Sequence, residues 1–111
     1  KIHLKHYTIM TKENFIELLN GLHKIQSESI KDRNIIMWIV LNNYTNPTDI
    51  QMVIEVTLFI GGKKNQHSYT FFEEEEPRKV WDSLDDIHKR FRKRPVLRDL
   101  VKELKEKVIN G

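Results

Sequence analysis

The sequence predicts a two-layer α+β sandwich: a helix, a three-stranded antiparallel meander and two further helices. Three observations favour this class. Apolar residues recur at helical spacing near the start of the chain and in its last third, strand-like apolar patterns fill the middle, and turn-forming residues separate those patterns. Helices that flank an antiparallel meander pack on one of its faces. A length of 111 residues suits one domain, residues 1–111.

The first nine residues allow two interpretations. Residues 1–9 form a short extra strand with Ile2 and Leu4 on one face, or they were added ahead of a native start at Met10. His3 and His6 are expected to be surface residues. An i,i+3 pair on a strand points to opposite faces, and no third metal ligand lies nearby in the sequence.

The first helix is predicted over residues 11–27. Thr11 is a suitable N-cap, and Glu13 in the first turn complements the helix dipole. Gly21 weakens the helix interior, and the serines at 27 and 29 end it. Its apolar stripe, which we expect to cover the sheet, consists of Phe15, Leu18, Leu19, Leu22 and Ile25.

Three strands are predicted in the middle of the chain. The unbroken apolar run at 35–41 predicts a central strand buried on both faces or nearly so, and residues 42–49 predict a turn. Residues 50–60 place their side chains alternately on two faces of a strand, so that one face packs on the core and the other is partly exposed to solvent. The glycine-rich residues 61–65 predict a hairpin loop that leads into a third strand over 67–72.

Two helices are predicted after the strands. Pro77 suits the first position of a helix over 77–93, and Pro95 interrupts before a last helix over 96–109, with Asn110 and Gly111 as its cap. The first apolar stripe is Val80, Trp81, Leu84, Ile87 and Phe91. The second is Leu97, Leu100, Val101, Leu104 and Val108.

Composition restricts the setting of the protein. The chain has no cysteine, which excludes disulfides, thiol nucleophiles and cysteine-ligated metals and favours a cytoplasmic, intracellular location. No apolar run reaches the roughly 20 residues of a membrane helix. Alanine is absent while isoleucine, lysine and asparagine are frequent, which indicates an AT-rich genome such as that of a low-GC bacterium, a mobile element or a virus.

Signals for catalysis are weak, and we predict a protein without catalytic residues, metal site or cofactor. Asp49, Glu55 and Thr57 resemble the acid and Glu-x-Lys pattern of metal-dependent nucleases, but threonine stands where the lysine is needed. The acids of 82–86 are expected to be solvated helix charges rather than cation ligands. The Gly-Gly-Lys-Lys segment at 61–64 precedes a strand, whereas a phosphate-binding loop precedes a helix.

The stretch from 73 to 98 carries the functional hypothesis. Its first half is acidic and its second half is basic, as the dipole of a helix over 77–93 favours. The dipole acts only over the terminal turns, so it does not explain six cations that we expect to lack counter-ions. We predict that they contact the phosphates of DNA or RNA, helped by two lysines of the hairpin loop. The predicted site is Lys89, Arg90, Arg92, Lys93, Arg94 and Arg98, with Lys63 and Lys64.

A protein-binding module is the alternative prediction. In a phage- or plasmid-encoded inhibitor or an immunity-type partner, acidic residues would mimic phosphates, or the basic patch would dock on an acidic protein. The acidic candidates are Glu73, Glu74, Glu75, Glu76, Asp82, Asp85 and Asp86.

Overall fold

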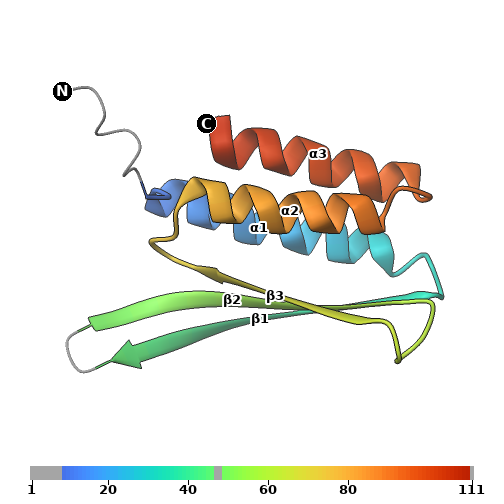
Figure 1. The fold of residues 1–111 in the computed structure, drawn as a ribbon, viewed down its shortest axis with the longest axis horizontal. Coiled ribbons are helices and arrows are strands. Elements are labelled where there is room, and N and C mark those ends of the chain that lie inside the picture. Colours follow the sequence, from blue (N-terminus) through green and yellow to red (C-terminus); the bar gives the residue numbers. More distant parts are fainter. Residues whose placement is uncertain (1–8, 47–48, 111) are drawn as a thin grey trace.

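The computed structural model describes residues 9–46 and 49–110. Within them the chain forms α1 (Lys12–Ser29), β1 (Ile35–Asn46), β2 (Asp49–Ile60), β3 (Gln66–Phe72), α2 (Pro77–Arg90) and α3 (Pro95–Asn110). The strands form one antiparallel sheet in the order β1-β2-β3, and the helices lie on one face of it (Figure 1). The predicted two-layer α+β class is confirmed.

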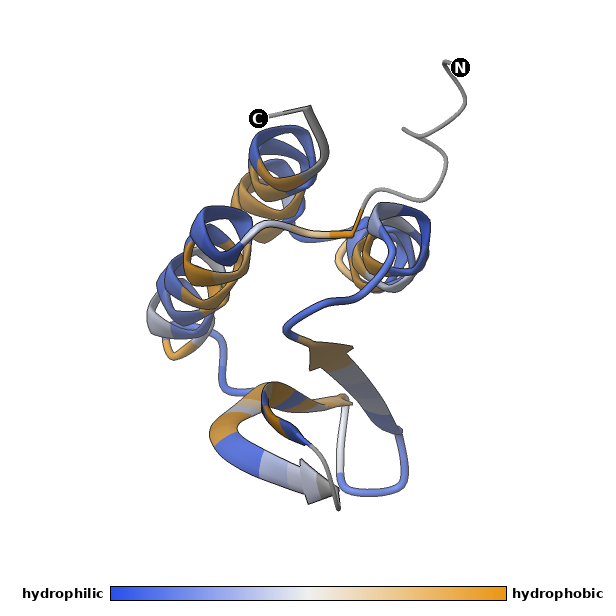
Figure 2. Ribbon diagram, turned by 90° about the vertical axis from the view of Figure 1, so that its left-hand side faces the viewer, coloured by the Kyte–Doolittle hydropathy of each residue, from blue (hydrophilic) through white to orange (hydrophobic). Residues whose placement is uncertain are grey.

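One hydrophobic core joins the sheet to all three helices. In Figure 2 the apolar segments of the helices lie on the sides that face one another and the sheet. Helix α1 packs against β1, α3 packs against both α1 and α2, and all three strands contribute side chains to the same core. The fully buried members include Leu18, Leu22, Ile54, Leu58, Phe71, Val80, Leu84, Ile87, Phe91 and Val101. Burial of this apolar surface is the main force that holds the layers together.

Helix α1 follows its prediction closely. Thr11 caps the helix, since its Oγ1 accepts a hydrogen bond from the backbone N–H of Asn14 at 3.1 Å. The helix runs two residues beyond the predicted end, and there the hydroxyl of Ser29 donates to the carbonyl of Gln26 at 2.7 Å. The same carbonyl also accepts from the backbone N–H of Ile30 at 3.2 Å, so the Ser29 hydroxyl adds a second donor at the helix end.

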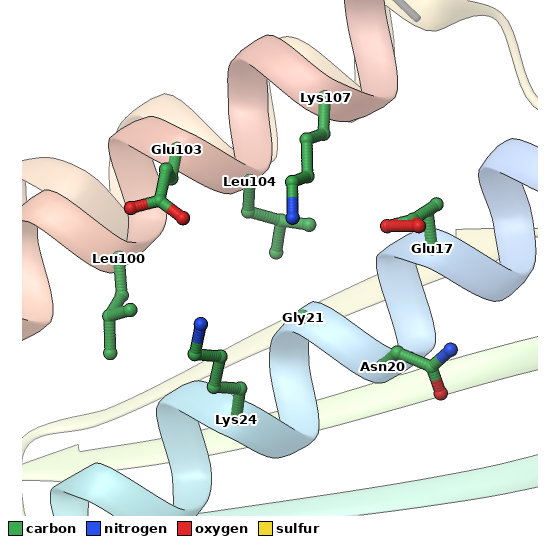
Figure 3. Close-up of a pocket in the computed structure, with 8 residues that line it drawn as sticks. All are labelled: Glu17, Asn20, Gly21, Lys24, Leu100, Glu103, Leu104 and Lys107. Atoms are coloured by element: carbon green, nitrogen blue, oxygen red, sulfur yellow. The ribbon is translucent and has the colours of Figure 1, made fainter.

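Gly21 has a packing role that explains its place inside α1. A Cβ atom at this position would collide with the side chain of Leu104. Figure 3 shows Leu104 of α3 directed at the α1 backbone beside Gly21. The charged side chains of Glu17, Lys24 and others surround this contact and line a pocket of about 120 Å³. The missing side chain therefore allows α1 and α3 to approach each other closely.

Strand β1 is the largest departure from the sequence prediction. It is an edge strand rather than a central strand, and only one of its faces is buried. Ile35 and Met37 point into the core, whereas Trp38 on the opposite face is 57% exposed. The prediction was wrong because an unbroken apolar run looks the same whether the second apolar face is buried or left in solvent.

The turn predicted over residues 42–49 is also largely wrong. β1 continues to Asn46 and β2 begins at Asp49, with an unbroken register from Asn42↔Val53 to Asn46↔Asp49. Pairing with β2 overrides the turn preference of the asparagines, because strand propensity depends strongly on cross-strand neighbours. Figure 1 shows that this hairpin extends past the helices.

The alternation predicted for β2 is confirmed. Ile54, Val56 and Leu58 are buried against the helices, and the other face holds the exposed Glu55. We call this second face of the sheet, which points away from the helices, the outer face. Phe59 is nevertheless buried on the outer face, partly because its ring packs edge-to-face against Trp38 with centroids 5.3 Å apart.

Helices α2 and α3 meet at a tight bend. Pro77 is the first residue of α2, as predicted, but the helix ends at Arg90 rather than at residue 93. Pro95 is the first residue of α3, a position that its fixed φ angle favours, rather than a residue ahead of it. None of the described helices is both long enough and apolar enough to cross a bilayer. The strand predicted within residues 1–9, His3, His6 and the cap at Gly111 lie outside the described residues, apart from Ile9.

Candidate functional site

Three segments that are distant in the sequence meet at one end of the molecule. They are the α1–β1 connection (30–34), the β2–β3 turn (61–65) and the helix end and bend around Pro95 (88–98), all at the right in Figure 1. The carbonyl of Asn34 accepts a hydrogen bond from the N–H of Gly61 at 2.8 Å, which joins the first two segments. The fold therefore brings hairpin and helix cations to the same place.

These segments concentrate the positive charge of the protein. We call their ten cations the basic end: Lys31, Arg33, Lys63, Lys64, Lys89, Arg90, Arg92, Lys93, Arg94 and Arg98. The same segments contain a single acid, Asp32. Only nine of the 19 cations but fifteen of the 16 acids lie elsewhere in the chain, so the rest of the sequence is net negative. All eight residues of the predicted site belong to the basic end.

The prediction that six of these cations lack counter-ions is wrong for four of them. Each of the four has a carboxylate nearby: Lys89 with Asp85 at 3.5 Å, Arg90 with Asp86 at 3.3 Å, Arg94 with Asp32 at 2.7 Å, and Arg98 with Asp99 at 3.5 Å. Two of these pairs join residues i and i+4 on α2, a spacing that is visible in the sequence.

The Arg94–Asp32 pair fixes the bend to the α1–β1 connection. Both side chains are about two-thirds buried or more, and the Asp32 carboxylate also accepts from the N–H of Asn34 at 2.9 Å. The hydrogen bond from Arg94 is the main cause that holds the pKa of Asp32 below its usual 3.8, and the bond from Asn34 acts in the same direction. This pair is structural, because its partners lie 62 residues apart and tie two of the three segments together.

Five cations of the basic end remain without an acidic partner. Among the described residues, no carboxylate lies within 4.0 Å of Arg33, Lys63, Lys64, Arg92 or Lys93. All five are exposed. We call them the free cations. They come from all three segments, and they are the groups most available to an external anion.

The basic end is hollowed between its segments. A pocket of about 500 Å³ lies between the β2–β3 turn and the end of α2, with Asn65, His67, Lys89, Arg90 and Arg92 among its lining residues. A second pocket, of about 340 Å³, is lined by residues of both the α1–β1 connection and the bend. Such open hollows between cations give an anion several donors at once.

Arg90 is held at the first pocket by a short polar chain. The hydroxyl of Tyr69 donates to the Asp86 carboxylate at 2.5 Å, and Arg90 donates to the same oxygen at 3.3 Å. Burial, and next the hydrogen bond to Asp86, raise the pKa of Tyr69 to about 12. The tyrosine therefore stays neutral and remains a donor across the physiological pH range.

A second polar group, centred on Lys105, lies between α2 and α3. Lys105 is 8% exposed, its ammonium lies 3.0 Å from Asp85, and it sits 4.2 Å from the centroid of the Trp81 ring. The hydrogen bond from Lys105 is the main cause that lowers the pKa of Asp85. Burial, followed by the charge of Lys105, lowers the pKa of His88. This group was not predicted from the sequence, where its only visible signal is a lysine beside an apolar stripe.

The acidic residues of the predicted alternative are largely engaged within the fold. The Glu73 carboxylate accepts from the N–H of Met52 at 3.1 Å, and the Glu75 carboxylate accepts from the N–H of Phe72 at 3.1 Å. These bonds shape the connection from β3 to α2. Asp85 and Asp86 are engaged by the groups described above, whereas Glu74, Glu76 and Asp82 are exposed.

The nuclease-like residues do not converge. Asp49 and Glu55 lie six residues apart on β2, a separation of about 20 Å along a strand. Glu55 accepts a hydrogen bond from the side-chain amide of Asn42 at 2.9 Å. Among the described residues, no cluster of three or more histidine and acidic side chains could hold a metal ion. Gly61 and Gly62 have φ angles of 81° and 126°, as a tight turn between strands requires.

Comparisons with protein-family models, with curated proteins and with solved structures find no match to this chain.

Proposed function

We propose that this protein binds the phosphate backbone of nucleic acids through the basic end, without catalysis. The gathering of three basic segments at one end of the fold is the observation that carries the proposal. The rest of the chain is net negative, so a polyanion is attracted to this end and repelled elsewhere. The proposed site of action is intracellular, in keeping with the lack of cysteine.

The five free cations supply the main phosphate contacts in this proposal. Two of them are arginines, whose guanidinium groups bind phosphate oxygens with two hydrogen bonds. The cations that already have carboxylate partners contribute less to the binding affinity, because a phosphate must displace those partners. The ion pair between Asp32 and Arg94 instead fixes the geometry of the surface.

The proposed binding discriminates little between base sequences. Lysine and arginine contacts to phosphates carry no direct sequence information. Phe91, the aromatic residue nearest the bend in the sequence, is fully buried and is therefore not available to stack on a base. Affinity is expected to depend on salt and on charge density more than on sequence.

A module that acts through its acidic residues has less support. Glu73, Glu75, Asp85 and Asp86 already accept hydrogen bonds within the fold, and each would have to exchange a partner to imitate a phosphate. We therefore keep nucleic-acid binding as the proposed function.

The test compares two double charge reversals that are chemically identical. Arg92 and Lys93 are consecutive exposed cations of the basic end, and Arg78 and Lys79 are consecutive exposed cations at the opposite end of α2. Binding of labelled duplex DNA, single-stranded DNA and RNA is measured by fluorescence anisotropy at low salt. We expect Arg92→Glu/Lys93→Glu to lose most of the affinity and Arg78→Glu/Lys79→Glu to retain it.

Equal losses in the two variants would show that only net charge matters and would contradict a localised site. Absence of binding of the wild-type protein to all three nucleic acids at low salt would refute the proposal altogether. Circular dichroism of both variants checks that the fold is intact.

A further inference from the structure

In the part of the chain that the structure describes, the outward edge of β1 is open along most of its length. The bond from the N–H of Gly61 to the carbonyl of Asn34 shows that even-numbered residues of this strand bond to β2. Odd-numbered residues therefore direct their N–H and C=O groups away from the sheet. The N–H of Ile35 bonds to the carbonyl of Asp32, and the carbonyl of Met37 accepts from the side chain of Gln26 at 2.7 Å.

Beyond Met37 this edge has no cover among the residues that the structure describes. Within residues 9–46 and 49–110, no hydrogen-bond partner is found for the outward-facing backbone groups of Ile39, Leu41, Asn43 and Thr45. The tip of the β1–β2 hairpin extends past the helices (Figure 1), so no described helix covers the end of this edge. Unpaired backbone groups on a long edge strand form a template for another strand.

The strand also lacks the usual protection of an edge. Its 12 residues, IIMWIVLNNYTN, contain no charged residue, proline or glycine. Its outer face exposes Ile36, Trp38, Val40 and Tyr44, with 57% of Trp38 and 55% of Tyr44 accessible. Natural edge strands commonly carry charges or prolines that prevent further pairing. A neutral, apolar edge is consistent with a partner strand that is itself neutral and apolar.

We propose that β1 pairs antiparallel with β1 of a second copy of this chain, about a two-fold axis at Leu41. In this register Leu41 lies opposite Leu41 of the second copy, and Ile39 lies opposite Asn43 of the second copy. These odd-numbered residues use the open backbone groups. The two sheets then form one continuous sheet of six strands, with both sets of helices on the same side.

The outer-face side chains favour this register. Trp38 lies opposite Tyr44 of the second copy, and Val40 lies opposite Asn42 of the second copy. Both are non-hydrogen-bonded pairs, in which cross-strand side chains approach most closely. The two most exposed aromatic residues of the strand therefore cover each other, as aromatic cross-strand pairs do in sheets.

A second copy fits the edge better than a charged partner strand does. Because β1 carries no charge, self-pairing places no like charges opposite each other, whereas a charged strand would find no counter-ion on β1. The proposal does not depend on the basic end, which lies beyond the start of β1. The two proposals can therefore fail separately.

The two-fold register gives a specific test by charge pairing. Leu41 is 42% exposed in the single chain, so a charged side chain at this position is compatible with folding. In the dimer, Leu41→Lys or Leu41→Glu places two like charges directly opposite each other. Sedimentation equilibrium should show a dimer of twice 13.3 kDa for the wild type and a monomer for each variant. An equimolar mixture of the two variants should recover the dimer, because lysine then faces glutamate.

Val96→Lys is the matched control, since Val96 is an exposed apolar residue of α3 with 59% accessibility. This variant should remain a dimer. The proposal is overturned by a monomeric wild type at the highest soluble concentration, by dimeric Leu41 variants, or by a mixture that stays monomeric. Open-ended association of the wild type, in place of a dimer, would contradict the closed two-fold pairing. Circular dichroism verifies the fold of each variant.

Discussion

The salt dependence of nucleic-acid binding follows from the number of free cations. Each phosphate that a cation neutralises releases counter-ions from the nucleic acid, so the logarithm of the association constant falls linearly with the logarithm of salt concentration. If the five free cations contact phosphates and the paired cations do not, the expected slope is about −4.5 for duplex DNA and about −3.5 for a single strand. If all ten cations took part, the duplex slope would approach about −9.

Substitution of two free cations should change this slope by a calculable amount. Removal of Arg92 and Lys93 as Arg92→Gln/Lys93→Gln leaves three free cations and an expected duplex slope of about −2.7. Anisotropy titrations over a series of potassium chloride concentrations measure both slopes. The control Arg78→Gln/Lys79→Gln should keep the wild-type slope. The reasoning is refuted if the slope of Arg92→Gln/Lys93→Gln equals that of the wild type, or if the wild-type slope is near zero.

Three further predictions concern stability, each measured by urea unfolding. Gly21→Ala should lower the free energy of unfolding, because overpacking against Leu104 costs about 1–3 kcal/mol and exceeds the roughly 1 kcal/mol gain in helix propensity. A higher urea midpoint for this variant would contradict the packing role of Gly21. Arg94→Gln should cost about 1 kcal/mol at neutral pH. Because the folded-state pKa of Asp32 is lowered, this cost should begin to shrink near pH 3.8 and disappear as the pH falls through that lower pKa; a cost that persists in stronger acid would exclude the ion pair as its cause. Because the pKa of His88 is lowered in the fold, the unfolded chain binds a proton at this residue more tightly than the folded chain does. The free energy of unfolding should therefore fall as the pH drops below 6.5, and His88→Gln should reduce that fall. An unchanged pH profile in this variant would contradict the role of His88.

The local features of the fold were predictable from the sequence. The cap at Thr11, the position of Pro77 at the start of α2 and the alternation of β2 depend on neighbouring residues, and all are confirmed. Periodicity also identified the core side of each helix. These features can be predicted because the repeat of a helix or a strand determines which side chains share a face.

The position of β1 was not predictable in the same way. The apolar residues of its outer face suggest in the sequence that this face is buried. In the fold the face is exposed, and Trp38 is the most exposed residue of the 35–41 run. An edge strand and a central strand differ in their neighbours, and hydrophobic pattern carries no information about neighbours. The turn predicted at the asparagines failed for a related reason, since pairing with β2 decides the conformation there.

The candidate site was predicted in part. The cations of residues 89–98 lie close together in the sequence, and they stay together at one end of the fold. Their partners on α2 could have been identified from i,i+4 spacing, as for Lys89 and Asp85. The Arg94–Asp32 pair could not, because 62 residues separate its members. The addition of Lys31 and Arg33 to the same surface likewise follows only from the folded arrangement.

The central claim, that the basic end binds a nucleic-acid backbone, is tested most directly by locating the bound ligand. Titration of isotope-labelled protein with a short DNA duplex, followed by amide chemical shifts in NMR spectra, reports which residues the ligand affects. The account predicts that shifts concentrate in residues 30–34, 61–65 and 88–94 and that added salt reverses them. Shifts centred on Glu73–Glu76 or on the outer face of the sheet, or no shifts at low salt, would contradict it.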